Sequence, residues 1–200
     1  MFIVLEGGEG CGKSTQIGAL VEHLRNAGHD VVATFEPGAT ARGAALRRFL
    51  LADESPLAER AELLVMAADR AQHVAEVVRP ALARGAVVVS DRYAPSSLVY
   101  QGVGRGLGVE AVAAISDFAA GGLVPDVVVV LDVDDATAAA RRPVAEDRME
   151  KAGAEFHQRV RQAYRDLAAT FGWTVVDARG AVDDVTAAVL DAVLPTITSR

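Results

Sequence analysis

Short apolar runs alternate with longer segments of helical periodicity along the whole chain. Two of the runs, Val87–Val89 and Val127–Leu131, lack polar residues at alternate positions, as expected for strands buried on both faces of a sheet. Strands are therefore predicted at residues 2–6, 30–35, 86–90, 126–132 and 173–177. Helices are predicted at residues 13–27, 40–51, 57–84, 109–120, 134–141, 150–171 and 181–193. This alternation predicts an α/β fold in three layers, a five-stranded and mainly parallel sheet flanked by helices.

Glycine and proline residues mark several boundaries of these helices. Gly28 follows the first predicted helix and Gly85 the third, and both positions suit the left-handed conformation that ends many helices. Pro80 lies inside the third predicted helix, where its ring and missing N–H predict a kink.

Residues 7–14 read Gly-Gly-Glu-Gly-Cys-Gly-Lys-Ser and join the first predicted strand to the first predicted helix. This is the G-x-x-x-x-G-K-[ST] pattern of a loop that holds the phosphates of a nucleoside triphosphate. Gly7, Gly10 and Gly12 allow backbone conformations that a Cβ would obstruct, so that N–H groups can turn toward phosphate oxygens. The positive end of the helix dipole adds to this attraction. The pattern predicts a P-loop fold that binds a nucleoside triphosphate.

The other residues of this loop have separate expected roles. Lys13 should reach the β- and γ-phosphates, and the Ser14 hydroxyl should bind Mg²⁺. Thr15 either contacts the nucleotide or serves only the first helical turn. Cys11 lies beside Lys13 at a helix N-terminus, which favours a reactive thiolate, and the alternative is a small residue chosen for its fit. The remaining positions expected to contact the triphosphate are Gly8 and Glu9.

Charged residues also follow two other predicted strands, at Glu36 and at Asp91-Arg92. Open parallel sheets bind ligands at the carboxyl ends of their strands, so these residues should lie near the phosphate loop. Asp91 could then hold Mg²⁺ or its water ligands, and Arg92 could clamp a phosphate with two hydrogen bonds. A surface Asp-Arg pair that caps a turn is the alternative.

Composition and charge restrict the function classes. The 200 residues carry a net charge of −7 and are 51% hydrophobic, which suits one globular domain, residues 1–200, and argues against nucleic acid as a partner. An acidic protein that binds phosphates must concentrate its arginines locally. The single cysteine excludes an intramolecular disulfide and a cysteine metal cluster. With no basic leader and no apolar run long enough for a membrane span, we expect a cytoplasmic protein without a membrane partner.

The chain resembles the bacterial thymidylate kinase family. The most specific match is the string DRYAPSSLVYQGVGRG at 91–106. The other matching segments are 2–15, 36–51, 62–73 (ELLVMAADRAQH), 147–150 and 156–164 (FHQRVRQAY). The resemblance implies phosphorylation of dTMP with ATP and Mg²⁺, a five-stranded parallel core and a homodimer.

The resemblance also implies roles for individual residues on the acceptor side. Glu9 matches the loop carboxylate that contacts the acceptor sugar, and Arg92 matches the arginine that grips the acceptor phosphate. Arg47 is a second candidate for that phosphate, and Arg70 matches the arginine that hydrogen-bonds the thymine edge. Further residues expected in the acceptor site are Glu36, Ser97, Tyr100, Gln101 and Arg105.

Three positions depart from the family pattern. Met66 stands where the family usually has an aromatic ring that stacks on thymine. It lies one helical turn before Arg70 and so on the same face, where its thioether either packs on the base or fills the core. Phe35 replaces the usual arginine before Glu-Pro-Gly, and Ala39 replaces a usual glycine.

The expected reaction needs positive charge rather than a general base. The phosphate of dTMP is largely dianionic at pH 7, because the second pKa of a phosphate monoester is near 6. The obstacle is repulsion between two polyanions, which Mg²⁺, Lys13 and Arg92 would offset. The variable loop positions contain no basic residue, so mobile arginines should come from a lid at residues 141–150. Its candidates are Arg141, Arg142 and Arg148, and a solvated basic turn is the alternative.

Two other readings stay open. A related kinase could act on a deoxynucleoside or on another monophosphate, and Glu36 could then be the base that a 5′-hydroxyl needs. A GTPase-like switch is the reading from another class. Such switches typically carry an Asn-Lys-x-Asp string, which is absent here.

Overall fold

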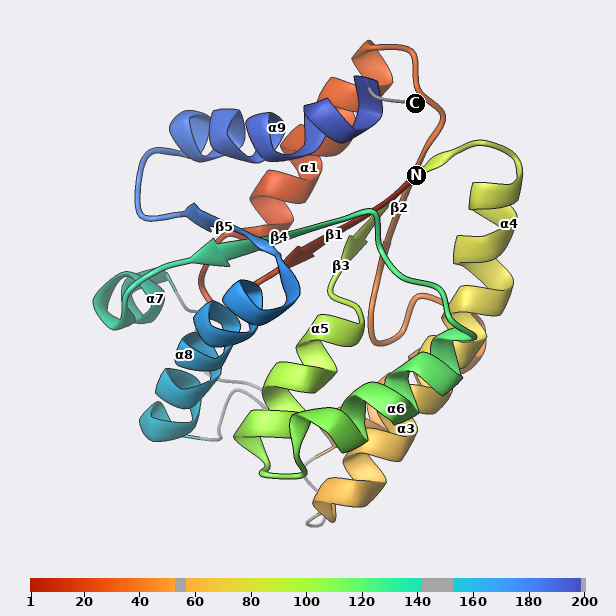
Figure 1. Ribbon diagram of the computed structural model, residues 1–200, viewed down its shortest axis with the longest axis vertical. Coiled ribbons are helices and arrows are strands. Elements are labelled where there is room, and N and C mark those ends of the chain that lie inside the picture. The colour runs from red at the N-terminus through yellow and green to blue at the C-terminus, as the bar shows by residue number, and fades with distance from the viewer. Residues whose placement is uncertain (53–56, 142–152, 199–200) are drawn as a thin grey trace.

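Five parallel strands form the centre of the molecule in the order β2-β3-β1-β4-β5 (Figure 1). The computed structural model describes residues 1–52, 57–141 and 153–198. The strands are β1 (Phe2–Glu6), β2 (Val31–Phe35), β3 (Val87–Asp91), β4 (Val127–Asp132) and β5 (Thr174–Asp177). Each lies within about a residue of its predicted bounds, and the predicted parallel α/β fold is confirmed.

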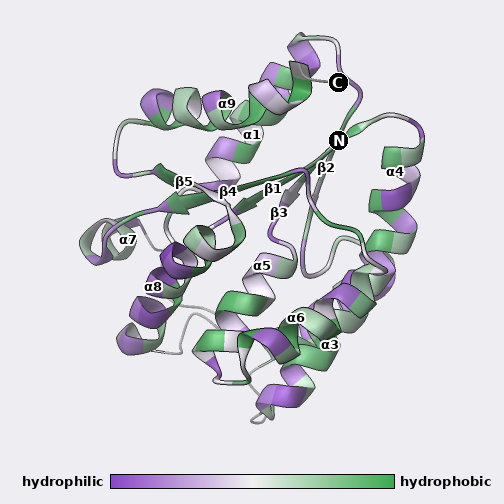
Figure 2. Cartoon of the chain, viewed as in Figure 1, coloured by the Kyte–Doolittle hydropathy of each residue, from purple (hydrophilic) through white to green (hydrophobic). Residues whose placement is uncertain are grey.

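The core of the sheet is apolar on both faces. In β1, Phe2, Ile3, Val4 and Leu5 are each at most 1% exposed. Phe2 lies opposite Val88 of β3. In Figure 2 much of β1 and β4 has the hydrophobic colour. This burial explains why the runs have no polar residue at alternate positions.

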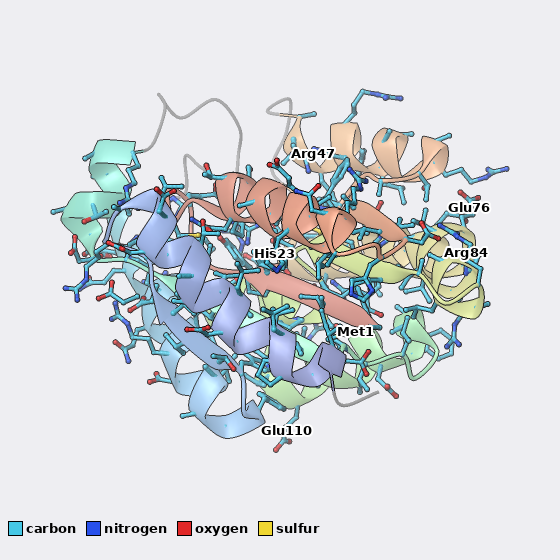
Figure 3. All side chains as sticks on the ribbon, turned by 90° about the horizontal axis from the view of Figure 1, so that it is seen from above. Met1, His23, Arg47, Glu76, Arg84 and Glu110 are labelled. Atoms are coloured by element: carbon cyan, nitrogen blue, oxygen red, sulfur yellow. The ribbon has the colours of Figure 1, made fainter. Side chains whose placement is uncertain are left out.

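Helices cover both faces of the sheet, as Figure 1 and the view from above in Figure 3 show. On one face α1 (Lys13–Asn26) packs against α9 (Val182–Thr198). The other face carries α3 (Glu59–His73), α4 (Arg79–Ala83), α5 (Ala94–Ser97), α6 (Val109–Ala120) and α8 (Ala154–Phe171). The remaining helices are α2 (Ala41–Leu51), which packs on α3, and α7 (Asp135–Arg141), which follows β4.

Two helical segments differ in kind from the prediction, and α9 continues to Thr198, beyond its predicted end at residue 193. The predicted helix 57–84 consists of α3, a π-helical segment η1 (Val74–Val78) and α4. The π-helical segment ends just before the helix that holds Pro80, whose nitrogen has no hydrogen to donate to the preceding turn. The helix formed by α5 and a second π-helical segment, η2 (Leu98–Gly104), was not predicted at all. It contains most of the string on which the family resemblance rests.

None of the helices in the described part of the chain combines the length and apolarity needed to cross a bilayer.

Candidate active site

The loop after β1 has a backbone that only glycine can adopt at two positions. Gly7 has φ = +140°, and a Cβ there would lie 2.5 Å from the carbonyl oxygen of Leu131. Gly10 has φ = +76°, and its Cβ would lie 2.5 Å from the carbonyl oxygen of Ala138. The loop is therefore packed against the end of β4 and against α7, which holds its N–H groups in one arrangement.

Lys13 begins α1 and its ammonium group lies inside this loop. Lys13 Nζ donates hydrogen bonds to the carbonyl oxygens of Gly7 (3.2 Å) and Gly8 (3.3 Å). Ser14 and Thr15 are exposed and line a wide cleft beside the loop. Four arginines line the same cleft, so an acidic protein does concentrate positive charge here. They are Arg47, Arg48, Arg92 and Arg141.

Cys11 is 2% exposed and belongs to the hydrophobic core between the sheet and α1. The Lys13 ammonium lies 3.8 Å from its sulfur. This burial supports the interpretation that Cys11 is a small residue chosen for its fit, rather than a thiol open to reagents.

Arg92 turns from the end of β3 toward the phosphate loop. Arg92 Nη1 donates to the carbonyl oxygen of Gly7 (3.2 Å), and Nη2 pairs with the Glu9 carboxylate. In the described part of the chain, Arg92 is the one residue other than glycine with a positive φ, +69°. A strained backbone of this kind persists only where its surroundings hold it, and it is common at functional sites.

The Asp91 carboxylate lies beside this corner with an unused acceptor. Asp91 Oδ1 is buried and has no hydrogen-bonding partner among the described residues. Mg²⁺ commonly uses one or two carboxylates, while phosphate and water oxygens supply its other ligands. The described residues hold no cluster of three or more histidine, cysteine or carboxylate ligands. The Asp91 oxygen and the exposed Ser14 hydroxyl therefore fit Mg²⁺ bound with a nucleotide, rather than a metal held by protein ligands alone.

A second cavity, of about 110 Å³, lies across Arg92 from the phosphate loop. Arg70 is buried in its wall, where Nε donates to Glu36 Oε2 (3.0 Å). Its two terminal nitrogens donate to the hydroxyls of Ser116 and Ser97, both at 3.1 Å. Each terminal nitrogen keeps a second N–H. Arg70 thus presents a fixed pair of donors, which suits the edge of a planar base.

The same cavity brings together most of the predicted acceptor residues. Met66 is half-buried and lines the cavity, so it is placed to contact a ligand rather than only to fill the core. The Tyr100 hydroxyl is buried and has no hydrogen-bonding partner among the described residues, and the Arg92 guanidinium lies over its ring. The remaining predicted residues that line this cavity are Glu9, Glu36, Arg47, Ser97 and Gln101.

Glu36 orients other side chains. Its Oε2 accepts from Arg70, and its Oε1 lies 2.8 Å from His73 Nδ1. His73 Nε2 in turn lies 2.7 Å from the Thr34 hydroxyl. Both carboxylate oxygens of Glu36 are therefore occupied. This arrangement does not leave Glu36 poised as a general base, the role that a deoxynucleoside kinase would require.

Two arginines contact backbone carbonyls at the margins of the cleft. Arg47 donates to the carbonyl oxygen of Pro37 (2.9 Å). Arg141 donates to the carbonyl oxygens of Ala178 (2.7 Å) and Arg179 (3.2 Å), beside a small cavity between α1 and α9. The predicted lid residues Arg142 and Arg148 lie outside the described residues, as does most of the segment 141–150.

The sequence patterns did not identify several polar residues at the site. Gln101 Nε2 donates to the buried Glu62 carboxylate (2.8 Å), which also pairs with Arg105. Asp69 Oδ1 accepts from the N–H of Gly38 (3.0 Å). Burial raises the pKa of the Glu6 carboxyl, although the Arg92 charge opposes this shift. Ser96 and Tyr164 bind the same Glu6 carboxylate.

One of these residues had a recognisable signal. Glu6 ends the apolar run of β1, in the same strand-end position as Glu36 and Asp91. Applied to β1, the strand-end rule would have singled it out.

A phosphate loop and an adjoining cavity, both lined by Arg92, are typical of one class of protein, the P-loop phosphotransferases. Comparisons agree with this class. The family model for thymidylate kinase matches residues 5–189. A thymidylate kinase from Clavibacter sepedonicus is 52% identical over 172 residues, 84% of this chain and 82% of that protein. One from Bifidobacterium longum (strain DJO10A) is 47% identical over 195 residues, 94% of this chain and 95% of that protein.

A crystal structure of thymidylate kinase from Ehrlichia chaffeensis superposes with a TM-score of 0.80 at 29% identity, covering 97% of this chain and 98% of that one. The chain therefore belongs to the thymidylate kinase family.

The Asp69→Asn variant should change how stability depends on pH. Burial, and then the Glu36 charge, raise the pKa of Asp69 from 3.8 to about 6. The folded protein thus retains a proton that the unfolded chain has already lost, and the contribution of Asp69 to wild-type stability falls as the pH rises through this range. The variant keeps an acceptor for Gly38 without the charge. The free energy of unfolding of the variant, measured relative to that of the wild type, should increase between about pH 4 and about pH 7.5. The increase should be at most about 3 kcal/mol.

Urea unfolding at the two pH values measures this difference. Glu110→Gln, which removes an exposed carboxylate on α6 (Figure 3), is the control and should leave the wild-type pH dependence unchanged. A difference between Asp69→Asn and wild type that stays constant with pH would contradict the buried-charge explanation.

Proposed function

We propose that the protein carries out the reaction of its family, the phosphorylation of dTMP to dTDP, with ATP as phosphoryl donor and Mg²⁺ as the metal. One observation carries the proposal. Arg92, on the acceptor side, donates a hydrogen bond to Gly7 of the donor loop (3.2 Å), so that the two sites meet at one point. The phosphates of two nucleotides bound there would face each other across a shared positive charge.

The donor side consists of the phosphate loop and the start of α1. Backbone N–H groups of residues 7–15 and the Lys13 ammonium hold the phosphates of ATP. Asp91 and Ser14 hold Mg²⁺, which when bound neutralises charge on the phosphate oxygens. The cavity beside Arg141, lined by Gln16, Gly180 and Val182, would receive the purine.

The acceptor side consists of the cavity around Arg70. Arg92 and Arg47 bind the phosphate of dTMP, and Glu9 contacts its sugar. Arg70 and Ser97 contact the thymine edge, while Met66 packs on the face of the base, where its polarizable thioether replaces part of the aromatic stacking. Tyr100 and Gln101 border the deoxyribose. The unpartnered Tyr100 hydroxyl supports this placement, because a buried hydroxyl without a partner is costly unless a ligand satisfies it.

The chemistry follows from charge. An oxygen of the dTMP phosphate attacks the γ-phosphorus of ATP, the bond to the β-phosphate oxygen breaks, and ADP leaves. The attacking oxygen is already largely deprotonated at neutral pH, so no general base is required. Lys13 and Arg92 offset the repulsion between donor and acceptor and hold them in line.

A coupled assay of ADP release with ATP and a panel of acceptors tests this function. We expect dTMP to give the highest kcat/KM among dTMP, dUMP, AMP, CMP and thymidine. The five acceptors separate base recognition from the need for a phosphate. Faster turnover of thymidine would favour a nucleoside kinase, and no ADP release with any monophosphate would favour a regulatory switch.

The lid segment 141–150 should supply further positive charge. Arg142→Ala and Arg148→Ala should each lower kcat by about 10-fold or more, because arginines that close over ATP stabilise charge in the transition state. Thermal melting should show that neither change disturbs folding. Arg141→Ala belongs to the same series, since Arg141 lines the cleft. Unchanged turnover in all three single variants would contradict the hypothesis that this segment is a lid.

Large exposed apolar side chains on α2, α3 and α6 support a homodimer. Phe118 on α6 is 89% exposed, and Leu64 on α3 and Phe49 on α2 are each more than half exposed. α3 packs against both α2 and α6, and large exposed apolar side chains on neighbouring helices indicate a protein interface.

Phe118→Glu and Leu64→Glu should therefore convert a dimer into a monomer, as measured by light scattering after gel filtration. A charge at the centre of a buried interface is costly. Phe171→Glu is the matched control, because Phe171 is an exposed phenylalanine on α8 rather than on α2, α3 or α6. Monomeric wild-type protein, or dimers in both variants, would contradict the assignment.

A further inference from the structure

Glu6 ends β1 and is completely buried, yet four donors reach its carboxylate. Its Oε1 accepts from the backbone N–H groups of Tyr93 (2.9 Å) and Ser96 (3.1 Å). Its Oε2 accepts from the hydroxyls of Ser96 (2.6 Å) and Tyr164 (2.8 Å). These partners come from the turn after β3 and from α8. One buried carboxylate therefore joins three separate parts of the chain.

These hydrogen bonds hold the turn that begins with Arg92. Tyr93 directly follows Arg92, and Ser96 lies one helical turn further along. Ser90, two residues before Arg92, donates its hydroxyl to the Arg92 carbonyl oxygen (2.8 Å). The positive φ of Arg92 thus lies between anchored residues on both sides. Such anchoring offsets the cost of a left-handed conformation at a residue with a side chain.

The same network also determines which atoms face the Arg92 guanidinium. Arg92 Nη1 lies 3.1 Å from the Ser96 hydroxyl and 3.3 Å from the Tyr164 hydroxyl. A guanidinium only donates hydrogen bonds, so both hydroxyls must accept from it. Their own protons need another acceptor, and Glu6 Oε2 is within 2.8 Å of each. Glu6 thereby turns the lone pairs of both hydroxyls toward Arg92.

We propose that Glu6 and Tyr164 are positioning residues for Arg92, which set both its backbone and the orientation of its guanidinium for phosphoryl transfer. This inference rests on the proposed function, in which Arg92 contacts the acceptor phosphate. Tyr164 is its sharpest probe, because the hydroxyl can be removed while the buried ring remains. Neither residue lies on the wall of the dTMP cavity.

Tyr164→Phe should therefore lower kcat by about 10-fold and leave KM for dTMP and ATP within about 3-fold. A misaligned arginine affects the in-line arrangement of the transition state more than ground-state binding. Val160→Ala is the matched control: Val160 is buried on the same helix, one turn earlier, and takes no part in the hydrogen bonds of Glu6 or Arg92, so its truncation leaves a small cavity and keeps that network. It should lower the melting temperature without lowering kcat at a temperature where the variant is folded.

A double-mutant cycle with Arg92→Ala decides whether Tyr164 acts through Arg92. In the Arg92→Ala background the additional change Tyr164→Phe should alter kcat by less than about 2-fold, because the side chain it positions is gone. An equal fold-loss in both backgrounds would overturn the proposal and leave Tyr164 with a role independent of Arg92. A normal kcat for Tyr164→Phe alone would overturn it as well.

Glu6→Gln is the second variant, and it keeps the size of the side chain. Its amide nitrogen is a donor and cannot replace the oxygen that accepts two hydrogen bonds, so kcat should fall at least as far as in Tyr164→Phe. Wild-type kcat in folded Glu6→Gln would overturn the part assigned to Glu6. The Arg92→Ala variant tests the proposed function independently of Tyr164. If Arg92→Ala retains wild-type kcat, the role assigned to Arg92 is wrong, whatever the result for Tyr164→Phe.

Discussion

In the proposed reaction, the mutual repulsion of two phosphate-bearing nucleotides is the constraint on which the rest of the site depends. A protein with a net charge of −7 has to gather positive charge at one place and keep it there. It does so at the ends of β1 and β3, where Lys13 lies within the phosphate loop and Arg92 reaches that loop from the neighbouring strand. Buried carboxylates then fix the arginines, Glu36 beneath Arg70 and Glu6 through two hydroxyls beneath Arg92.

Parallel pairing of β1 with β3 makes this arrangement possible. Leu5 lies opposite Asp91, so the phosphate loop and the Arg92 corner leave the sheet at the same level. β2 pairs on the other side of β3, with Phe35 opposite Asp91, which brings Glu36 to the same edge. The phosphate loop and the cavity around Arg70 thus lie at adjacent strand ends, where rigid strands and buried carboxylates hold them with little freedom to move apart.

Patterns along the chain were enough to predict the strands, the phosphate loop and the Asp91-Arg92 corner, because each depends on local residue order. The helix at 94–104 was missed because Pro95, Gly102, Gly104 and two valines have weak helix propensity. Tertiary packing stabilises this helix instead. The Tyr164 hydroxyl bonds a residue 158 positions away, and no periodicity along the chain can reveal such a contact. The position of Glu6 at a strand end was recognisable from the sequence. Its hydrogen-bond partners could be recognised only in three dimensions.

Calorimetric titration with a compound that joins adenosine and thymidine 5′ to 5′ through a chain of five phosphates tests the central claim most directly. If the two nucleotides meet at Arg92, this single molecule spans both sites and should bind at least about 100-fold tighter than ATP, because its two ends bind as one ligand. Excess dTMP should compete with it, and Arg92→Ala should remove most of the gain. An affinity equal to that of ATP, and indifferent to dTMP, would contradict the account.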